Sequence, residues 1–204
     1  MNFKTQKILA LLGLIGPIFY FLLMTTFGSL WKGYNPIRDP ICELGSVDSP
    51  YKNVMNIFGF MLLGVFIILF SFAFYQQFRK NRFSKITYIF LLIGGVFIIL
   101  VGFFPCDPDC IDVTSTGKLH SLTSIPQFIA LPLAVFFSSF VFERDERWKR
   151  RWPAISFVLG LILLITGPLL TLPFLAPVAG LGQRIEVGLF FLWVSLVSAR
   201  MLLI

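Results

Sequence analysis

Between Lys85 and Asp107 the sequence runs for 21 residues without a formal charge. An α-helix of about 20 apolar residues crosses the roughly 30 Å hydrocarbon layer of a membrane, because each residue adds about 1.5 Å. Uncharged runs of this kind recur about six times in the 204 residues. Only 13% of the residues are charged, about half the fraction typical of soluble domains. The pattern predicts an all-α integral membrane protein that forms one domain, residues 1–204.

Six transmembrane helices are predicted, in a single bundle with no separate soluble domain. Their ranges are 8–30, 53–78, 84–104, 120–142, 153–173 and 183–203. The first span is expected to be retained, because it is longer than the apolar core of a typical signal peptide. The last span is the least apolar, since it contains Glu186 and Arg200. Both residues lie near its ends, where charged side chains reach the polar interface.

Basic residues are divided unequally between the two sets of connections. One set, which includes both ends of the chain, holds 12 Lys and Arg residues, and the other set holds 5. Connections rich in Lys and Arg stay in the cytoplasm, so both termini are predicted to be cytoplasmic and the protein to lie in the cell membrane. This sorting also accounts for the net charge of +7. Membrane lipid is therefore the expected partner, and no nucleic acid is expected.

Three polar segments fall on the predicted outer side, and the first is the loop 34–46. Asp39, Pro40 and Gly45 predict a short interfacial helix over residues 40–44, because these residue types favour a helix cap, a first turn and a helix end. Arg38, Asp39 and Glu43 would then form a local charge network. A solvated loop that caps itself has the same residues and is the alternative interpretation.

The second polar segment contains two cysteines, Cys106 and Cys110, with Asp107 between them and His120 after them. A disulfide between the two cysteines is the preferred interpretation, because the loop lies outside the reducing cytoplasm. A metal site of both cysteines, His120 and a carboxylate is a second interpretation. Cys42 lies on the same side, so free thiols or a link from Cys42 to either cysteine also remain. Neither a metal nor a cofactor is predicted.

The third polar segment is the start of the last span, with Arg184 and Glu186. Residues two apart do not face each other along a helix, so each side chain is expected to find its partner elsewhere. Asp39 or Glu43 is the predicted partner of Arg184, and Arg38 that of Glu186.

A polar stripe runs along the fourth predicted span. His120, Ser124 and Gln127 are spaced at i, i+4 and i+7 and therefore share one helix face. A polar face on a membrane helix is expected to point into the bundle. It would serve either for hydrogen bonds between helices or, through the only histidine, for acid–base chemistry or ligand contact.

Several function classes lack their sequence signals. The first five spans carry no charged residue near their centres, whereas ion-coupled transport normally needs one. A single histidine excludes haem held by two histidines. Nucleophile elbows, zinc-protease motifs and phosphate-binding loops are missing. The hexapeptide GVFIIL occurs twice, at 64–69 and 95–100, which chance explains in a chain dominated by a few apolar residues.

The outer segments resemble the motifs of a six-span prokaryotic family, domain of unknown function 998. Residues 38–46, RDPICELGS, resemble its R-D-P-I-S-x-L-G-S signature, and residues 102–107 resemble its G-x-F-P-x-D. His120 resembles its following histidine, and Gln183 with Arg184 its terminal Q-R pair. The likeness covers essentially the whole chain. Cys42 stands where the family usually has Ser or another small residue, and the Cys110 loop is not part of the pattern.

The resemblance implies a six-span fold and no particular activity, and it points to the same polar residues. We predict that they form a polar cup that recognises a lipid headgroup or small amphiphile, with Arg38 and Arg184 holding anionic groups. One alternative is an enzyme acting on a lipid ester or phosphate, with His120, Asp107 or Glu43 as acid–base groups. The other is a structural or accessory subunit, in which the cup is a salt-bridge clasp. The predicted cup residues are Arg38, Asp39, Glu43, Asp107, His120, Ser124, Gln127, Arg184 and Glu186.

Overall fold

The computed structural model describes residues 2–204, and the regular elements in this part of the chain are helical. Six helical segments are long and apolar enough to cross a membrane, which confirms the predicted fold class. The second segment is continuous and consists of α2 (Lys52–Val54), the π-helical η2 (Met55–Met61) and α3 (Leu62–Gln77). The other five long helices are α1 (Phe3–Leu30), α4 (Arg82–Phe103), α5 (Ser115–Glu143), α6 (Trp152–Leu169) and α7 (Ala179–Leu203).

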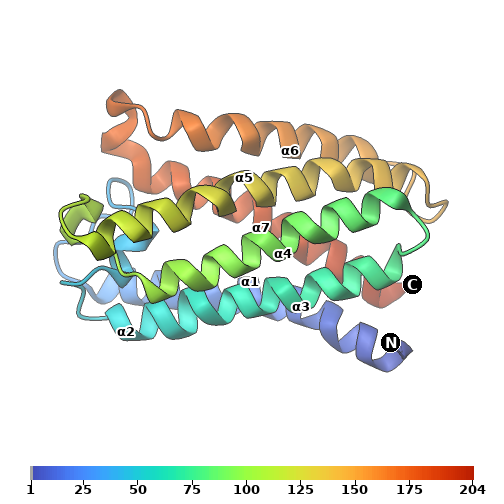
Figure 1. The fold of residues 1–204 in the computed structure, drawn as a ribbon, viewed down its shortest axis with the longest axis horizontal. Helices are drawn as coiled ribbons and strands as arrows, with labels where there is room; N and C mark the ends of the chain where they lie inside the picture. Colours follow the sequence, from blue (N-terminus) through green and yellow to red (C-terminus); the bar gives the residue numbers. More distant parts are fainter. Residues whose placement is uncertain (1) are drawn as a thin grey trace.

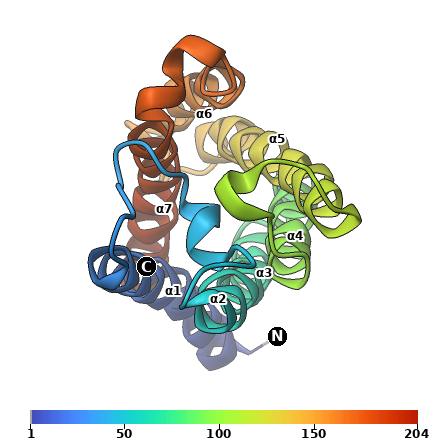
Figure 2. The ribbon, with the colours of Figure 1, turned by 90° about the vertical axis from the view of Figure 1, so that its left-hand side faces the viewer.

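The long helices form a ring in chain order, in which each packs against the next and α7 closes against α1 (Figure 2). Both termini lie at one end of the bundle, with the connections 78–81 and 144–151 (Figure 1). We call this the basic end. The opposite end carries the 3₁₀ helix η1 (Ile41–Gly45), which we call the plug, and we call this end the plug end. Which side of the membrane each end faces stays a prediction.

Four helix boundaries differ by four or five residues from the predicted spans, namely the starts of α1, α5 and α7 and the end of α6. Helix α5 begins at Ser115 rather than near residue 120, because Thr114 Oγ1 accepts a hydrogen bond from the Gly117 N–H and caps the helix. Helix α6 ends at Leu169, and a 3₁₀ segment, η4 (Pro173–Val178), precedes α7. Leu172 is extended, as residues before a proline tend to be, and this ends the helical path before Pro173.

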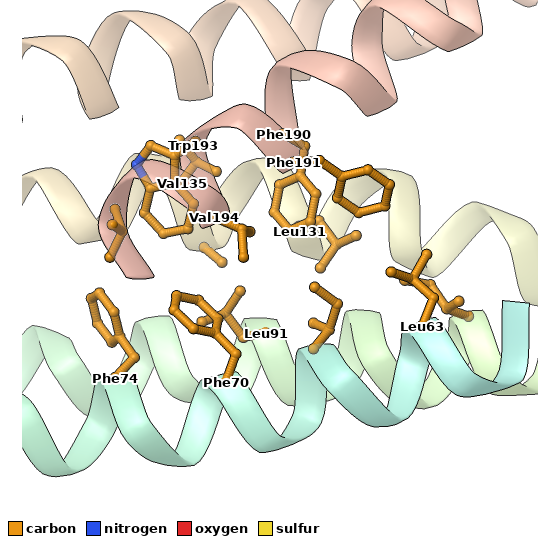
Figure 3. Packing of buried hydrophobic residues seen from close by; sticks show 14 of the residues in the cluster. Leu63, Phe70, Phe74, Leu91, Leu131, Val135, Phe190, Phe191, Trp193 and Val194 are labelled. Atoms are coloured by element: carbon orange, nitrogen blue, oxygen red, sulfur yellow. The ribbon is translucent and has the colours of Figure 1, made fainter. Parts of the chain in front are cut away.

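Aromatic and aliphatic side chains fill the bundle between α3, α4, α5 and α7 (Figure 3). Phe70 and Phe74 of α3 face Trp193 of α7, and the rings of Phe70 and Trp193 meet edge to face at 6.5 Å. The buried indole N–H of Trp193 donates to Ser156 Oγ at 2.9 Å, so its polar atom is satisfied. The core therefore ties α7 to both α3 and α6.

The two copies of the GVFIIL hexapeptide meet at their first residues. A Cβ atom added to Gly64 would lie 2.5 Å from the backbone oxygen of Gly95, and one added to Gly95 would lie 2.9 Å from that of Gly64. Helices in lipid associate through close backbone packing at small residues. The repeated glycines therefore set the distance between α3 and α4.

At the basic end, the side chain of Arg200 joins α7 to the connection between α5 and α6. Its guanidinium lies over the rings of Trp148 and Trp152, at 5.1 and 5.8 Å, and donates to the backbone oxygen of Arg147. Trp148 in turn stacks on Phe142 at 4.6 Å. The last turns of α7 are thus fastened to the connection between α5 and α6.

Candidate functional site

The plug occupies the centre of the ring at its end of the bundle (Figure 2). Ile41 and Leu44 are buried there, which anchors the plug among the long helices. The backbone N–H of Ile41 donates to Gln183 Oε1 at 2.6 Å, and Asn56 Nδ2 donates to the backbone oxygen of Gly45 at 2.9 Å. Side chains from α7 and η2 therefore hold both ends of the plug.

Arg184 fastens the loop before the plug to α7. Its Nη1 donates to the backbone oxygens of Asp39 and Gly180, both at 2.9 Å, and its Nη2 donates to Tyr34 Oη. The guanidinium also lies 5.4 Å from the centre of the Tyr34 ring. Burial raises the pKa of Tyr34 to about 12 even though the Arg184 charge acts in the opposite direction. The phenol is therefore neutral and accepts the hydrogen bond from Arg184.

The charged residues of the loop line a small outer pocket of about 160 Å³. Arg38 Nε and Nη2 donate to the Asp39 carboxylate at 2.5 and 3.1 Å, and the Asn35 N–H donates to it at 2.7 Å. Glu43 also lines this pocket and makes no ion pair with the described residues. Burial, with the carboxylates of Asp39 and Asp109, raises the pKa of Glu43 to about 7.

The hydrogen bonds to Asp39 predict a loss of stability in acid. Burial alone would raise the pKa of Asp39, but hydrogen bonds from Arg38 and Asn35 outweigh burial and hold it below its usual range. Such a carboxyl stabilises the fold above its unfolded-state pKa, and this stability is lost as the pH falls through the folded-state pKa. We expect the thermal unfolding midpoint in detergent to fall between about pH 7 and pH 3, and to fall less in Asp39→Asn. An equal fall in both proteins would contradict this role.

Asp107 holds the α4–α5 connection in place. Its carboxylate accepts hydrogen bonds from the backbone N–H groups of Val113 and Thr114, at 2.9 and 2.7 Å, and from Thr114 Oγ1 at 2.8 Å. The bond from the Thr114 N–H is the main cause of its lowered pKa. Asp107 lines neither pocket, and its hydrogen bonds give it a structural role at the start of α5.

Three cysteines and His120 gather beside the plug. Cys106 and Cys110 lie in the α4–α5 connection, around the 3₁₀ helix η3 (Pro108–Cys110), and are joined in a disulfide. The Sγ of Cys42, on the plug, lies 3.2 Å from the Sγ of Cys110. His120 Nδ1 lies 2.6 Å from the backbone oxygen of Phe104, and a carbonyl only accepts, so Nδ1 carries the proton. In neutral His120, Nε2 is therefore the nitrogen with a free electron pair.

A cavity of about 530 Å³ lies inside the bundle, and the plug forms part of its wall. Most of its lining is apolar, with Phe60, Leu131 and Phe190 from three different helices. Within the described part of the chain, no lysine or arginine lines it. Its main polar lining residues are His120, Ser124 and Gln127 on α5 and Gln183 and Glu186 on α7.

Helices α5 and α6 both line the cavity. Towards the basic end the two helices are in close contact, since a Cβ atom on Gly160 would lie 2.6 Å from the backbone nitrogen of Phe136. Towards the plug end they diverge (Figures 1 and 2). Ile125 and Ile129 of α5 line the cavity there and are 57% and 51% exposed. Part of the cavity wall is therefore made by residues that lie on the surface that lipid would cover.

Glu186 is the acidic residue of this cavity. Its side chain is buried, and Oε1 has no hydrogen-bond partner among the described residues. A Cβ atom on Gly167 of α6 would lie 2.9 Å from this oxygen, so the glycine leaves room for the carboxyl. A buried polar atom without a partner costs free energy. The oxygen is thus available to accept a hydrogen bond from a ligand or a water molecule in the cavity.

The predicted polar cup is divided into two groups by the plug. Arg38, Asp39 and Glu43 line the outer pocket, whereas His120, Ser124, Gln127 and Glu186 line the main cavity. Arg184 and Asp107 line neither. That these residues bind a ligand stays a prediction.

The partners predicted for Arg184 and Glu186 are only partly those observed. Arg184 does bind Asp39, one of its two predicted partners, but through the backbone oxygen and not the carboxylate. Glu186 forms no ion pair with Arg38 among the described residues. Sequence reasoning did not assign a role to Gln183 or Tyr34. The Q-R pair of the family motif was the available signal for Gln183, since it adjoins Arg184.

A family model described as "Protein of unknown function (DUF998)" matches residues 14–200. The matched range extends from the first long helix to the last and includes the plug and both groups of polar residues. No curated protein and no solved structure matches the chain.

Proposed function

The chain belongs to the DUF998 family, and from its geometry we propose that it binds a single-chain membrane amphiphile in the main cavity. The observation that carries this proposal is the unpartnered carboxyl oxygen of Glu186 in an apolar cavity whose lining includes exposed residues of α5. We place the protein in the cell membrane, with the basic end in the cytoplasm, because Lys and Arg are concentrated in the connections at that end.

The cavity suits an acyl or alkyl chain. Its volume of about 530 Å³ is within the range of pockets that enclose small molecules, about 300–1,000 Å³. We place its entrance between α5 and α6, where the two helices diverge (Figures 1 and 2), so that a chain would enter from the lipid without passing through water. Ile125 and Ile129 at this entrance would contact the part of the chain that enters last.

The polar lining suits a headgroup that donates hydrogen bonds, such as an amine or an alcohol. Glu186 offers an acceptor, and the lining carries no fixed positive charge in the described chain. An anionic phosphate would meet a carboxyl without a compensating cation, which is unfavourable in a site of low dielectric constant. This changes the expected headgroup from anionic to neutral or cationic, because Arg38 and Arg184 lie outside the cavity.

Glu186→Gln tests the headgroup preference. We expect the affinity for dodecylamine to fall about tenfold or more, since a charge-assisted hydrogen bond of about 1.5 kcal/mol is lost. The affinity for dodecanol should change little. Native mass spectrometry of the protein in nanodiscs, titrated with each compound, measures both affinities.

Matched control variants distinguish a change in the cavity from a general effect on the protein. Glu146→Gln removes an exposed carboxyl at the basic end and should leave both affinities unchanged. Ser124→Phe fills the cavity and should abolish binding, whereas Leu122→Phe, on the same helix but outside the lining, should not. Binding of dodecyl phosphate as tight as that of dodecylamine, or equal binding by Ser124→Phe, would overturn the proposal.

A further inference from the structure

Four potential metal ligands converge where the plug meets the α4–α5 connection and the start of α5. They are the three cysteines, Cys42, Cys106 and Cys110, together with His120, and their ligand atoms all lie within 4.8 Å of one another. The residues come from three separate segments, so the cluster depends on the fold rather than on one short motif. Cys106 and His120 are buried, and Cys42 and Cys110 are half-buried.

We propose that this cluster, with its three cysteines reduced, binds one Zn²⁺ ion. Three thiolates and one imidazole are a common ligand set for zinc that has a structural role. With Zn–S bonds of about 2.3 Å and Zn–N bonds of about 2.0–2.1 Å, tetrahedral ligand atoms lie roughly 3.5–3.8 Å apart. The cluster falls within 4.8 Å as folded, so small side-chain adjustments complete this geometry.

The surroundings of His120 support ligation. Metal-bound histidines usually donate their second ring N–H to a backbone oxygen or a carboxylate, which fixes the orientation of the ring. Here Nδ1 donates to Phe104, at 2.6 Å, and Nε2 is left for the metal.

Zinc binding and the Cys106–Cys110 disulfide are alternative states of the same residues. Reduction by a dithiol adds two electrons and two protons to the disulfide, which yields two thiols and the oxidised dithiol. Zinc then replaces the thiol protons. With zinc, the plug would be joined to α5 and to the α4–α5 connection through one ion. Cys42, Cys110 and His120 also line the main cavity, but zinc binding does not require the proposed amphiphile.

The test uses the full-length protein, purified in detergent with a dithiol reductant. After incubation with Zn²⁺ and gel filtration, elemental analysis should find about one zinc per chain. Replacement by Co²⁺ should give the visible absorption of a tetrahedral site and a thiolate charge-transfer band. Oxidation to the disulfide, which lowers the mass by two hydrogens, should release the metal.

Single substitutions identify the ligands. Cys42→Ser and His120→Gln should each weaken zinc binding at least about a hundredfold, while Asp109→Asn, in the same connection but outside the cluster, should bind as tightly as the wild type. If a ligand variant does not fold, the charge-transfer intensity of the cobalt-loaded wild type still counts the thiolates. Reduced protein without bound zinc, an octahedral cobalt spectrum, or wild-type affinity in Cys42→Ser would overturn the proposal.

Discussion

Replacement of Gly64 by leucine is expected to separate α3 from α4 and to destabilise the protein by about 3 kcal/mol or more. A Cβ atom at this position would lie 2.5 Å from the backbone oxygen of Gly95 and 3.0 Å from the backbone nitrogen of Ile99. Backbone atoms cannot rotate away as a side chain can, so the helices themselves must move. Thermal unfolding of the purified protein in detergent, followed by tryptophan fluorescence, measures the loss.

Val65→Leu is the matched control for this prediction. Val65 is the next residue on α3, but its side chain is 40% exposed on the outer surface of the bundle, so the larger side chain meets lipid or detergent. It should unfold at the wild-type temperature. A Gly64→Leu protein as stable as Val65→Leu would show that the close contact between α3 and α4 does not determine their packing.

The number of spans was predictable because the membrane limits the structures that cross it. A helix in lipid satisfies its own backbone hydrogen bonds, so each long uncharged run corresponds to one helix. The sequence shows a repeated hexapeptide that contains Gly64 and Gly95. It does not show that the two copies are in contact in the folded protein. The start of α5 depends on the cap at Thr114, a polar signal that hydropathy does not register.

The candidate site was predictable as a set of residues but not as a set of contacts. Charge and motif placed Arg38, His120 and Arg184 at one end of the bundle. The position of the plug inside the ring depends on hydrogen bonds such as that between Ile41 and Gln183, which are 142 residues apart. Local patterns do not encode such a pairing, so one polar cup was predicted where the plug separates two pockets.

The cysteine cluster, too, could be predicted from the sequence only in part. Spacing alone pointed to Cys106 and Cys110, and a carboxylate was the expected additional ligand of any metal site. Asp107 is instead committed to Val113 and Thr114. The fold brings in Cys42, 64 residues before Cys106 in the chain, because the plug is buried beside the α4–α5 connection.

Gly180→Val is expected to release the plug from α7. A Cβ atom on Gly180 would lie 2.3 Å from the backbone oxygen of Asp39, the same oxygen that accepts from Arg184. The substitution would also disturb the hydrogen bond that the Gly180 N–H donates to the Arg38 oxygen at 3.0 Å. With a local loss of about 3 kcal/mol, amide hydrogen exchange in residues 34–46 should accelerate about a hundredfold. Mass spectrometry of peptides from this loop measures the exchange.

The effect should stop at the loop and the plug, because the core between α3 and α7 does not contact Gly180. Peptides from residues 62–77 should therefore exchange as slowly as in the wild type. Gly188→Val, on the same helix, is the control, since a Cβ atom there would meet only the Phe21 ring, at an ordinary contact distance of 3.5 Å. Unchanged exchange of residues 34–46 in Gly180→Val would mean that α7 does not hold the plug, and uniform acceleration along the chain would mean that the plug is not a separate unit of stability.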